Sequence, residues 1–245
     1  MIPQRFKIDR VKGHTFLKDY LNRAGSVIDL GMNRGDFART MHDTYGSCVI
    51  GAEANPVLAS NISKSNGIVC KNVAISDFDG YVKFSINEDS EASTIVSDTT
   101  PVSETVIPVP SITLSTFFRE AEVEQVDLLK IDVEGTELDI IETTEPDIFR
   151  RCTQIAVEFH RFLYPSHASR IEKAVALMSG FGFRHIDFSN ERTDVLFINS
   201  NKIDMSGAAT AAVVFYKYQA LMIRRLRRMV TPSRALVRAY RRLRP

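Results

Sequence analysis

Short β-branched runs alternate with helical segments along most of the chain, and this alternation constrains the fold more than any other feature. Strands separated by helices of about 10–15 residues imply βαβ crossovers. We therefore predict an α/β domain built on a doubly wound, mostly parallel sheet that helices cover on both faces. The predicted strands are 26–31, 48–53, 68–76, 81–86, 126–132, 154–160, 183–188 and 194–199, and the polar stretch 88–105 reads as a long loop.

The near-neutral net charge of +1 hides two parts of opposite charge. Residues 1–201 hold 20 Lys and Arg against 29 Asp and Glu, whereas residues 202–245 hold 11 Lys and Arg and a single acid, Asp204. Such an asymmetry is typical of a folded body with an interaction tail. We expect one domain over 1–201 and a basic, amphipathic helical appendage over 202–245.

The basic tail carries apolar residues at spacings of three and four between Phe215 and Met229, with arginines on the opposite side. A cationic helix with an apolar face fits an anionic membrane surface. It fits equally well packing against its own domain or a second copy of the chain, as in a homo-oligomer. Nucleic acid is the less favoured partner.

Cysteine usage and hydropathy indicate the compartment. Cys48, Cys70 and Cys152 lie far apart and form no Cys-x-x-Cys pair, which favours a reducing environment. Residues 1–13 contain no apolar stretch of the secretory kind, and the apolar run 207–216 is shorter than the roughly 20 residues of a membrane-spanning helix. We expect a cytoplasmic protein that at most rests on the inner face of a membrane.

A strand, a glycine turn and a helix follow one another in VIDLGMNRGDFA. The strand carries Asp29, and the turn holds Gly31, Asn33 and Gly35, where glycine lets a ligand approach the backbone. The spacing is not that of the dinucleotide fingerprint. Glu53 ends the next strand, where a carboxylate can accept both hydroxyls of a ribose. These features together predict a nucleoside-type ligand.

The segments VIDLGMNRG, GAEANP, VDLLKIDVEGTEL and VEFH resemble the FkbM family of S-adenosylmethionine-dependent methyltransferases. The resemblance implies a Rossmann-like, seven-stranded sheet with an antiparallel last strand. It implies S-adenosylmethionine as cofactor and O-methylation of a hydroxyl on a sugar, a glycan or a small metabolite. It also implies that Glu53 holds the ribose and that Asn72 lies near the adenine. The residues implied for the methionine end are Asp29, Gly31, Asn33 and Gly35.

A second group of charged residues follows two apolar strands, in KIDVEG (130–135) and EFH (158–160). The carboxyl ends of neighbouring parallel strands meet at one edge of a sheet, where α/β proteins bind ligands. We therefore expect these side chains to share one rim, although a structural ion pair would explain the lysine equally well. The candidate catalytic residues are His160, Glu158, Asp132, Lys130 and Glu134.

Methyl transfer to a hydroxyl requires alignment of the reactants and a base for the hydroxyl proton. We predict His160 as that base, with Glu158 or Asp132 orienting it. An Asp, Glu and His cluster could also hold a divalent cation, but no dense ligand motif is present and we predict no metal site. The isolated histidines are expected to be surface or packing residues; they are His14, His42, His167 and His185.

A second function class stays open at this stage. The chain could be a non-catalytic nucleotide-binding module that its basic tail tethers to a membrane or to nucleic acid.

Overall fold

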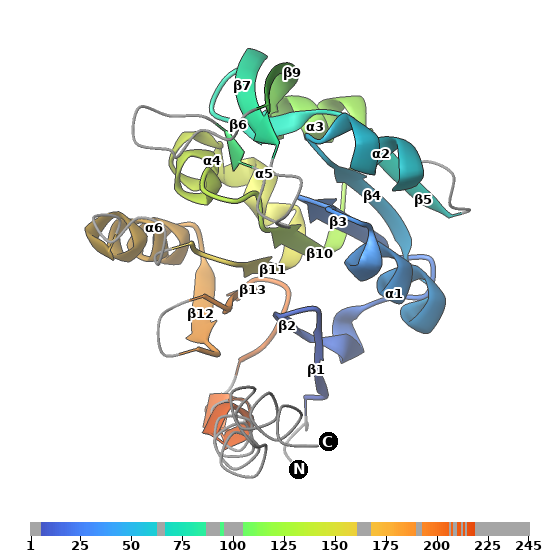
Figure 1. Ribbon diagram of the computed structural model, residues 1–245. Coiled ribbons are helices and arrows are strands. Elements are labelled where there is room, and N and C mark those ends of the chain that lie inside the picture. The colour runs from blue at the N-terminus through green and yellow to red at the C-terminus, as the bar shows by residue number, and fades with distance from the viewer. Residues whose placement is uncertain are drawn as a thin grey trace, which may run out of the picture. The chain divides into compact units, whose positions relative to one another are not determined.

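The computed structural model describes residues 6–62, 67–86, 94–95, 105–160, 168–189 and 193–205. It also describes a few positions between 207 and 218. The chain divides into two compact units, one of residues 6–205 and one of residues 1–5 and 206–245. The first unit carries all the elements labelled in Figure 1.

The first unit is built on a seven-stranded sheet (Figure 1). Six strands of this sheet run in one direction, and β13 runs in the opposite direction, pairing antiparallel with both β11 and β12. This confirms the predicted α/β class, the mostly parallel sheet and the antiparallel last strand. In spatial order the strands are β12 (Phe183–Asp187), β13 (Val195–Asn199), β11 (Cys152–Val157), β10 (Val126–Ile131), β3 (Ser26–Leu30), β4 (Cys48–Ala52) and β5 (Ile68–Lys71).

Apolar side chains cover both faces of this sheet, as a doubly wound fold requires. On one face they come from α3 (Leu114–Glu120), α4 (Glu137–Thr143), α5 (Pro146–Arg150) and α6 (Ala168–Gly180). On the other they come from α1 (Asp36–Tyr45), α2 (Pro56–Ile62) and the strands β1 (Ile8–Val11) and β2 (His14–Leu17). A short 3-10 helix, Lys18–Tyr20, follows β2.

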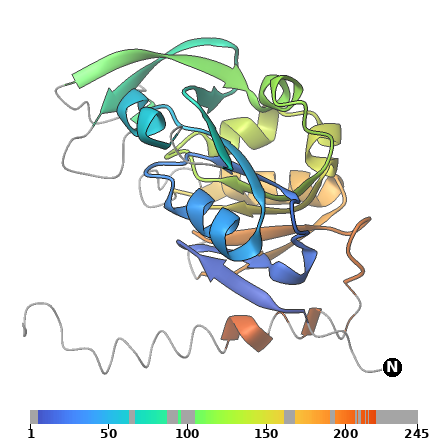
Figure 2. The same cartoon turned by 90° about the vertical axis from the view of Figure 1, so that its right-hand side faces the viewer.

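The predicted strand 68–76 is two strands in the structure. It breaks after β5 because Asn72 Nδ2 donates to the carbonyls of Glu53 at 2.9 Å and Ala54 at 3.1 Å, which draws the chain away from the main sheet. The following strand, β6 (Ala74–Ser76), joins a second sheet in the order β6-β9-β7-β8. This sheet also contains β7 (Gly80–Ile86), β8 (Thr94–Ile95) and β9 (Thr105–Thr113); β7 and β9 form the long teal and green ribbon of Figure 2.

Two elements in this region were not predicted as such. The sequence indicated a loop over 88–105, but Thr94–Ile95 form β8 and Thr105 begins β9. The other positions of that stretch lie outside the described residues.

The N-terminal hairpin of β1 and β2 was not predicted from the sequence either. Its turn, Lys12-Gly13, has φ values of +48° and +103°, and positive φ at both central residues suits the tight turn of a two-residue hairpin. The buried Gln154 of β11 accepts from Leu17 N–H at 2.8 Å and donates to the Leu17 carbonyl at 3.0 Å. This pairing fixes the end of the hairpin at Leu17 against the middle of β11.

The predicted basic tail falls in the second unit, and most of it lies outside the described residues. The few described positions between 207 and 218 are helical. Across the described part of the chain, no helix combines the length and hydropathy that a membrane span needs.

Candidate active site

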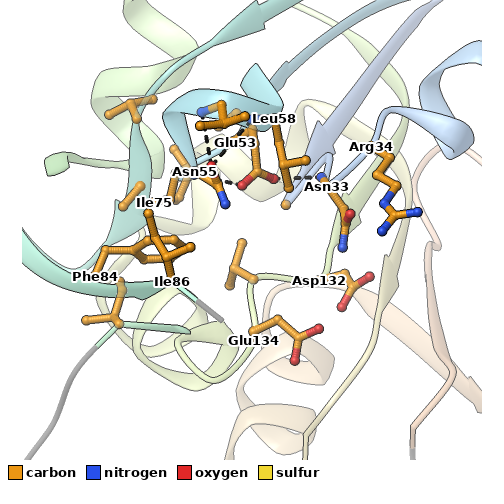
Figure 3. A pocket seen from close by; sticks show the side chains of 18 of the residues that line it. Asn33, Arg34, Glu53, Asn55, Leu58, Ile75, Phe84, Ile86, Asp132 and Glu134 are labelled. Carbon is orange, nitrogen blue, oxygen red and sulfur yellow. Dashed lines mark hydrogen bonds between the residues drawn. The ribbon is translucent and has the colours of Figure 1, made fainter. Parts of the chain in front are cut away.

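A cavity of about 410 Å³ opens at the carboxyl ends of β3, β4 and β10, the edge at which parallel sheets bind ligands (Figure 3). Glu53 and Asn33 stand on one side, and Asp132 and Glu134 stand across from them. The second sheet supplies an apolar wall that includes Phe84, Ile86 and Ile95. The cavity therefore joins a polar end to an apolar end.

Glu53 is held in place by backbone donors. Its Oε2 accepts from Asn33 N–H at 2.6 Å and its Oε1 from Asn55 N–H at 2.8 Å. Burial raises the pKa of Glu53 to about 6, although these two hydrogen bonds favour the ionised form. The result is a carboxylate held in a fixed orientation in the cavity wall.

The turn after β3 brings the backbone against the neighbouring strand. Gly31 has φ +78°, and a Cβ at this position would lie 1.8 Å from the carbonyl oxygen of Asp132. Only glycine meets both requirements. Asn33 follows with φ +52°, in the left-handed region that Asn tolerates. The glycine turn that the sequence indicated is therefore a point of close contact between β3 and β10.

The six predicted cofactor residues divide into two groups. Gly31, Asn33 and Glu53 line the cavity. The other three support the lining: Asp29 lies fully buried behind it, Gly35 caps the N-terminus of α1, and Asn72 ties down the segment after Glu53.

Lys130 makes a buried structural link between two strands. Its Nζ lies 2.9 Å from Asp29 Oδ1, donates to the Gly31 carbonyl at 2.9 Å, and lies 3.3 Å from Asp132 Oδ2. A buried lysine needs such partners. Lys130 does not line the cavity, so its position favours the structural ion pair that the sequence had left open.

Asp132 is the centre of the rim cluster. Its Oδ2 atom lies 3.3 Å from Lys130 Nζ and 3.2 Å from His14 Nε2. Its Oδ1 atom lies 3.6 Å from His160 Nε2. Although burial opposes ionisation, the surrounding cationic groups hold the pKa of Asp132 well below its usual range. Asp132 is therefore ionised and largely saturated with partners.

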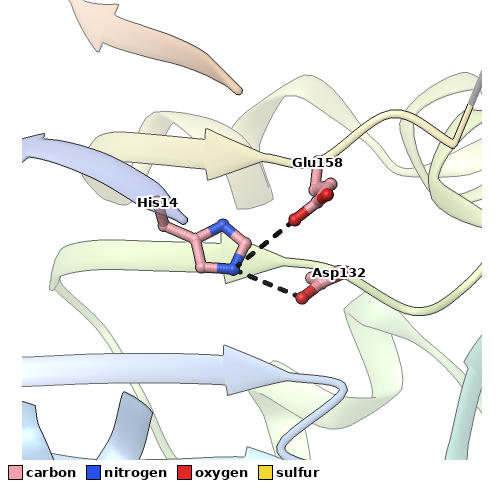
Figure 4. Close-up of side chains that lie close together, drawn as sticks. All are labelled: His14, Asp132 and Glu158. Atoms are coloured by element: carbon pink, nitrogen blue, oxygen red, sulfur yellow. Dashed lines mark ion pairs between the residues drawn. The ribbon is translucent and has the colours of Figure 1, made fainter. Parts of the chain in front are cut away.

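His14 is the residue that sequence reasoning placed wrongly. It is not an isolated packing residue, because the β1–β2 hairpin buries it beside Asp132 and 4.0 Å from Glu158 Oε2 (Figure 4). The lysine–glycine turn at 12–13 was the one local signal for the hairpin. Nothing in the sequence indicated that the hairpin would lie next to β10 and β11.

His160 lies between two carboxylates. Its Nδ1 is 2.8 Å from Glu137 Oε1, and its Nε2 is 3.1 Å from Glu134 Oε2. Burial disfavours a charged ring, but the hydrogen bonds to these carboxylates outweigh it and raise the pKa of His160 to about 11. The role of His160 as the general base stays a prediction, but a ring held by one carboxylate at each nitrogen is a geometry that favours a positioning role.

Glu137 is a further site residue that the sequence did not single out. Its carboxylate is buried and accepts from Val133 N–H at 3.2 Å and Gly135 N–H at 3.1 Å, besides facing His160. The turn it closes carries Glu134 at φ +58°. A non-glycine residue in this region is uncommon and is often found at functional sites. The turn directs Glu134 toward His160.

Glu158 differs from the neighbouring carboxylates in having unused hydrogen-bond capacity toward the described residues. It is part-exposed, and among the residues that the structure describes its carboxylate accepts no hydrogen bond. Burial, and then the nearby charge of Asp132, raise its pKa above the usual value. Two groups of three side chains at this rim could each hold a metal ion, because within each group the potential ligand atoms lie within 4.8 Å of one another. The groups are His14–Asp132–Glu158 and Asp132–Glu134–His160.

Comparison with known proteins places the chain in a family. The family model described as "Methyltransferase FkbM domain" matches residues 29–185. No curated protein sequence matches the chain.

Several solved structures resemble the chain at low sequence identity. A TehB-like S-adenosylmethionine-dependent methyltransferase from Corynebacterium glutamicum shares 12% identity over 73% of this chain and 82% of its own, with a TM-score of 0.34. Fibrillarin from Methanococcus jannaschii, a pre-rRNA processing protein, shares 12% identity over 79% and 81%, with a TM-score of 0.42. TrmK of M. capricolum, solved with S-adenosylhomocysteine, shares 10% identity over 89% and 87%, with a TM-score of 0.37.

The family match spans both the glycine turn with Glu53 and the rim with Asp132 and His160. The chain belongs to the FkbM methyltransferase family and is an S-adenosylmethionine-dependent methyltransferase.

Proposed function

We propose that the protein transfers a methyl group from S-adenosylmethionine to a hydroxyl of a sugar, a glycan or a small metabolite. The observation that carries this proposal is the arrangement of the cavity. A fixed carboxylate, Glu53, stands on one side, and a carboxylate rim around Asp132 and Glu134 stands on the other. The first suits the ribose of the cofactor, and the second suits a hydroxyl that must lose a proton.

For the cofactor, we propose that Glu53 accepts the two ribose hydroxyls. The turn with Gly31 and Asn33 would hold the methionine end, because its backbone is open to a ligand. Asp29 and Gly35 support that turn from behind, and Asn72 shapes the segment expected beside the adenine.

For the reaction, the sulfonium already activates the methyl group, so the protein must mainly align the acceptor oxygen with the methyl carbon and sulfur. Such positioning can lower the barrier by roughly 7–11 kcal/mol. As the new O–CH3 bond forms and the S–CH3 bond breaks, the hydroxyl proton passes to a rim carboxylate. We assign this role to Glu158. It lies just outside the cavity lining, with a carboxylate oxygen within 4.8 Å of Asp132, and this carboxylate accepts no hydrogen bond from the described residues. His160 then acts as a positioning residue for Glu134.

The test combines two measurements on the full-length chain. Calorimetry should show binding of both S-adenosylmethionine and S-adenosylhomocysteine, and a turnover assay over a panel of glycans, lipid-linked sugars and small hydroxylated metabolites should reveal the acceptor. Cofactor binding with no turnover on any hydroxyl acceptor would favour the alternative, a non-catalytic nucleotide-binding module. Turnover confined to amines would refute O-methylation.

We further propose that the basic tail, residues 206–245, holds the enzyme at an anionic membrane surface. The support is the charge of the tail, with arginines opposite an apolar stripe, since each basic residue near such a surface contributes about 1 kcal/mol. Sedimentation with anionic liposomes, with and without residues 206–245, tests this. Equal sedimentation of the two proteins would reject it, and so would binding that neutral liposomes reproduce.

A further inference from the structure

We propose that Asp132, Glu134 and His160 form a binding site for a divalent cation of the Mg²⁺ or Mn²⁺ type at the rim of the methyl-transfer cavity. One ligand atom from each of the three residues lies within 4.8 Å of the others. One imidazole and two carboxylates are a common donor set for such ions. The role of the cation in catalysis rests on the proposed O-methyl transfer, but the binding site does not.

The charge around this rim favours a cation. Asp132, Glu134 and Glu137 bring three carboxylates together around the His160 ring. The ammonium of Lys130 lies 3.3 Å from Asp132 but is paired more closely with Asp29, at 2.9 Å. Buried and part-buried carboxylates this close require compensation. A divalent cation supplies two positive charges at the point where these groups converge.

The orientation of His160 is that of a metal ligand with its supporting group. Histidine ligands commonly donate the ring N–H that faces away from the metal to a carboxylate, which fixes the tautomer and the ring plane. In this structure Nδ1 lies 2.8 Å from the buried Glu137, so Nε2 is the nitrogen aimed at Asp132 and Glu134. Glu137 in turn is held by the backbone N–H groups of Val133 and Gly135. A cation here would take the place of the Nε2 proton.

The alternative cluster, His14 with Asp132 and Glu158, is less suitable for two reasons. First, His14 approaches Asp132 on Oδ2, the same oxygen that lies 3.3 Å from the Lys130 ammonium, so a metal there would face a fixed positive charge. His160 instead approaches Oδ1. Second, Asp132 and Glu134 line the cavity, whereas His14 and Glu158 do not.

A cation at this position would have a direct chemical use. An acceptor hydroxyl bound to it is acidified, because the positive charge stabilises the alkoxide. The O–H bond then breaks with its proton passing to Glu158, the O–CH3 bond forms, and the S–CH3 bond breaks. The products are the methyl ether and S-adenosylhomocysteine, and Glu158 later releases its proton to solvent.

The test uses the full-length chain, stripped of metals with a chelator and titrated with Mn²⁺ alone. Paramagnetic resonance of free Mn²⁺ should show one bound ion per chain. Glu134→Gln and His160→Gln should each weaken Mn²⁺ binding by roughly tenfold or more. The matched controls Glu158→Gln and His14→Gln, which alter the alternative cluster, should bind Mn²⁺ as the wild type does.

Several outcomes overturn the proposal: no Mn²⁺ binding by the wild type, unchanged affinity in Glu134→Gln, or a loss confined to the two controls. If His160→Gln does not fold, Glu134→Gln decides, because Glu134 is part-exposed and its substitution leaves the core intact.

Calorimetry with S-adenosylhomocysteine on the same samples distinguishes failure of the cation site from failure of the proposed function. Cofactor binding without Mn²⁺ binding overturns the cation site alone, and Mn²⁺ binding without cofactor binding overturns the proposed function alone.

Discussion

The two sides of the cavity are built in different ways. The side that we propose for the cofactor (the cofactor side), formed by Gly31, Asn33, Glu53 and Asn55, comes from residues 31–55, where backbone N–H groups hold the Glu53 carboxylate. The side that we propose for the reaction (the reaction side) comes from three distant segments and is held by charge–charge contacts. Its residues are His14, Asp132, Glu134, Glu158 and His160. A site made by local backbone geometry depends little on other residues, whereas a charge network depends on every member.

The largest expected effect tests the reaction side. Glu158→Gln should lower turnover of the acceptor by roughly 10²- to 10⁴-fold, because it removes the proton acceptor. The affinity for S-adenosylhomocysteine should not change, since the cofactor side shares no contact with Glu158. Steady-state kinetics and calorimetry check both, with the exposed Glu124→Gln as control. Turnover within the range of the control would remove Glu158 from the reaction.

The next largest effect is a loss of stability that should disturb both sides of the cavity together. Gly31→Ala places a Cβ 1.8 Å from the Asp132 carbonyl and at φ +78°, so β3 and β10 must separate. Strain and overpacking together should lower the free energy of unfolding by roughly 2–5 kcal/mol. Urea denaturation measures this. The matched control is Gly180→Ala, at a helical position with no atom within 4 Å of the new Cβ. This substitution should not lower the free energy of unfolding. Equal stability of the two variants would contradict the close contact.

A smaller effect, on ligand affinity, tests whether the two sides of the cavity act independently. Glu53→Gln should weaken S-adenosylhomocysteine binding by roughly tenfold to a hundredfold, because hydrogen bonds to a charged acceptor contribute about 1.5–3 kcal/mol. Mn²⁺ affinity should stay at the wild-type value in the same variant. Calorimetry with each ligand provides the comparison. If Mn²⁺ affinity fell in parallel, the two sides would not be independent.

The smallest expected effect is a pH dependence of the cofactor side. Burial raises the pKa of Glu53 to about 6, so the ionised form that accepts ribose hydroxyls is present above this value and is lost as the pH falls through it. Affinity for S-adenosylhomocysteine should be roughly fourfold weaker at pH 5.5 than at pH 7.5. Calorimetry at the two pH values measures the change, and Glu53→Gln should abolish it. A persistent pH dependence in that variant would point to another group.

The difference between the two sides also explains which predictions from sequence succeeded. The strand–turn–helix with Gly31 and Asn33, and Glu53 at the end of the next strand, could be recognised because each leaves a residue signature in a short stretch of chain, and the hydrogen bonds of Glu53 stay within residues 33–55. The sequence also placed Asp132, Glu134, Glu158 and His160 on one rim correctly. The break at Asn72 and the second sheet were missed, because a single side chain that binds two carbonyls decides where the chain leaves the main sheet.

By itself, the sequence determined the α/β class, the mostly parallel sheet and the glycine turn after β3, because hydrophobic periodicity and glycine turns act within a few residues of chain. Only the tertiary structure decided the electrostatics of the reaction side. It brought His14 from the N-terminal hairpin to Asp132, paired Lys130 with Asp29, and placed Glu137 behind His160. The protonation of a histidine depends on the charges within a few ångströms in space, and the order of residues along the chain does not contain those distances.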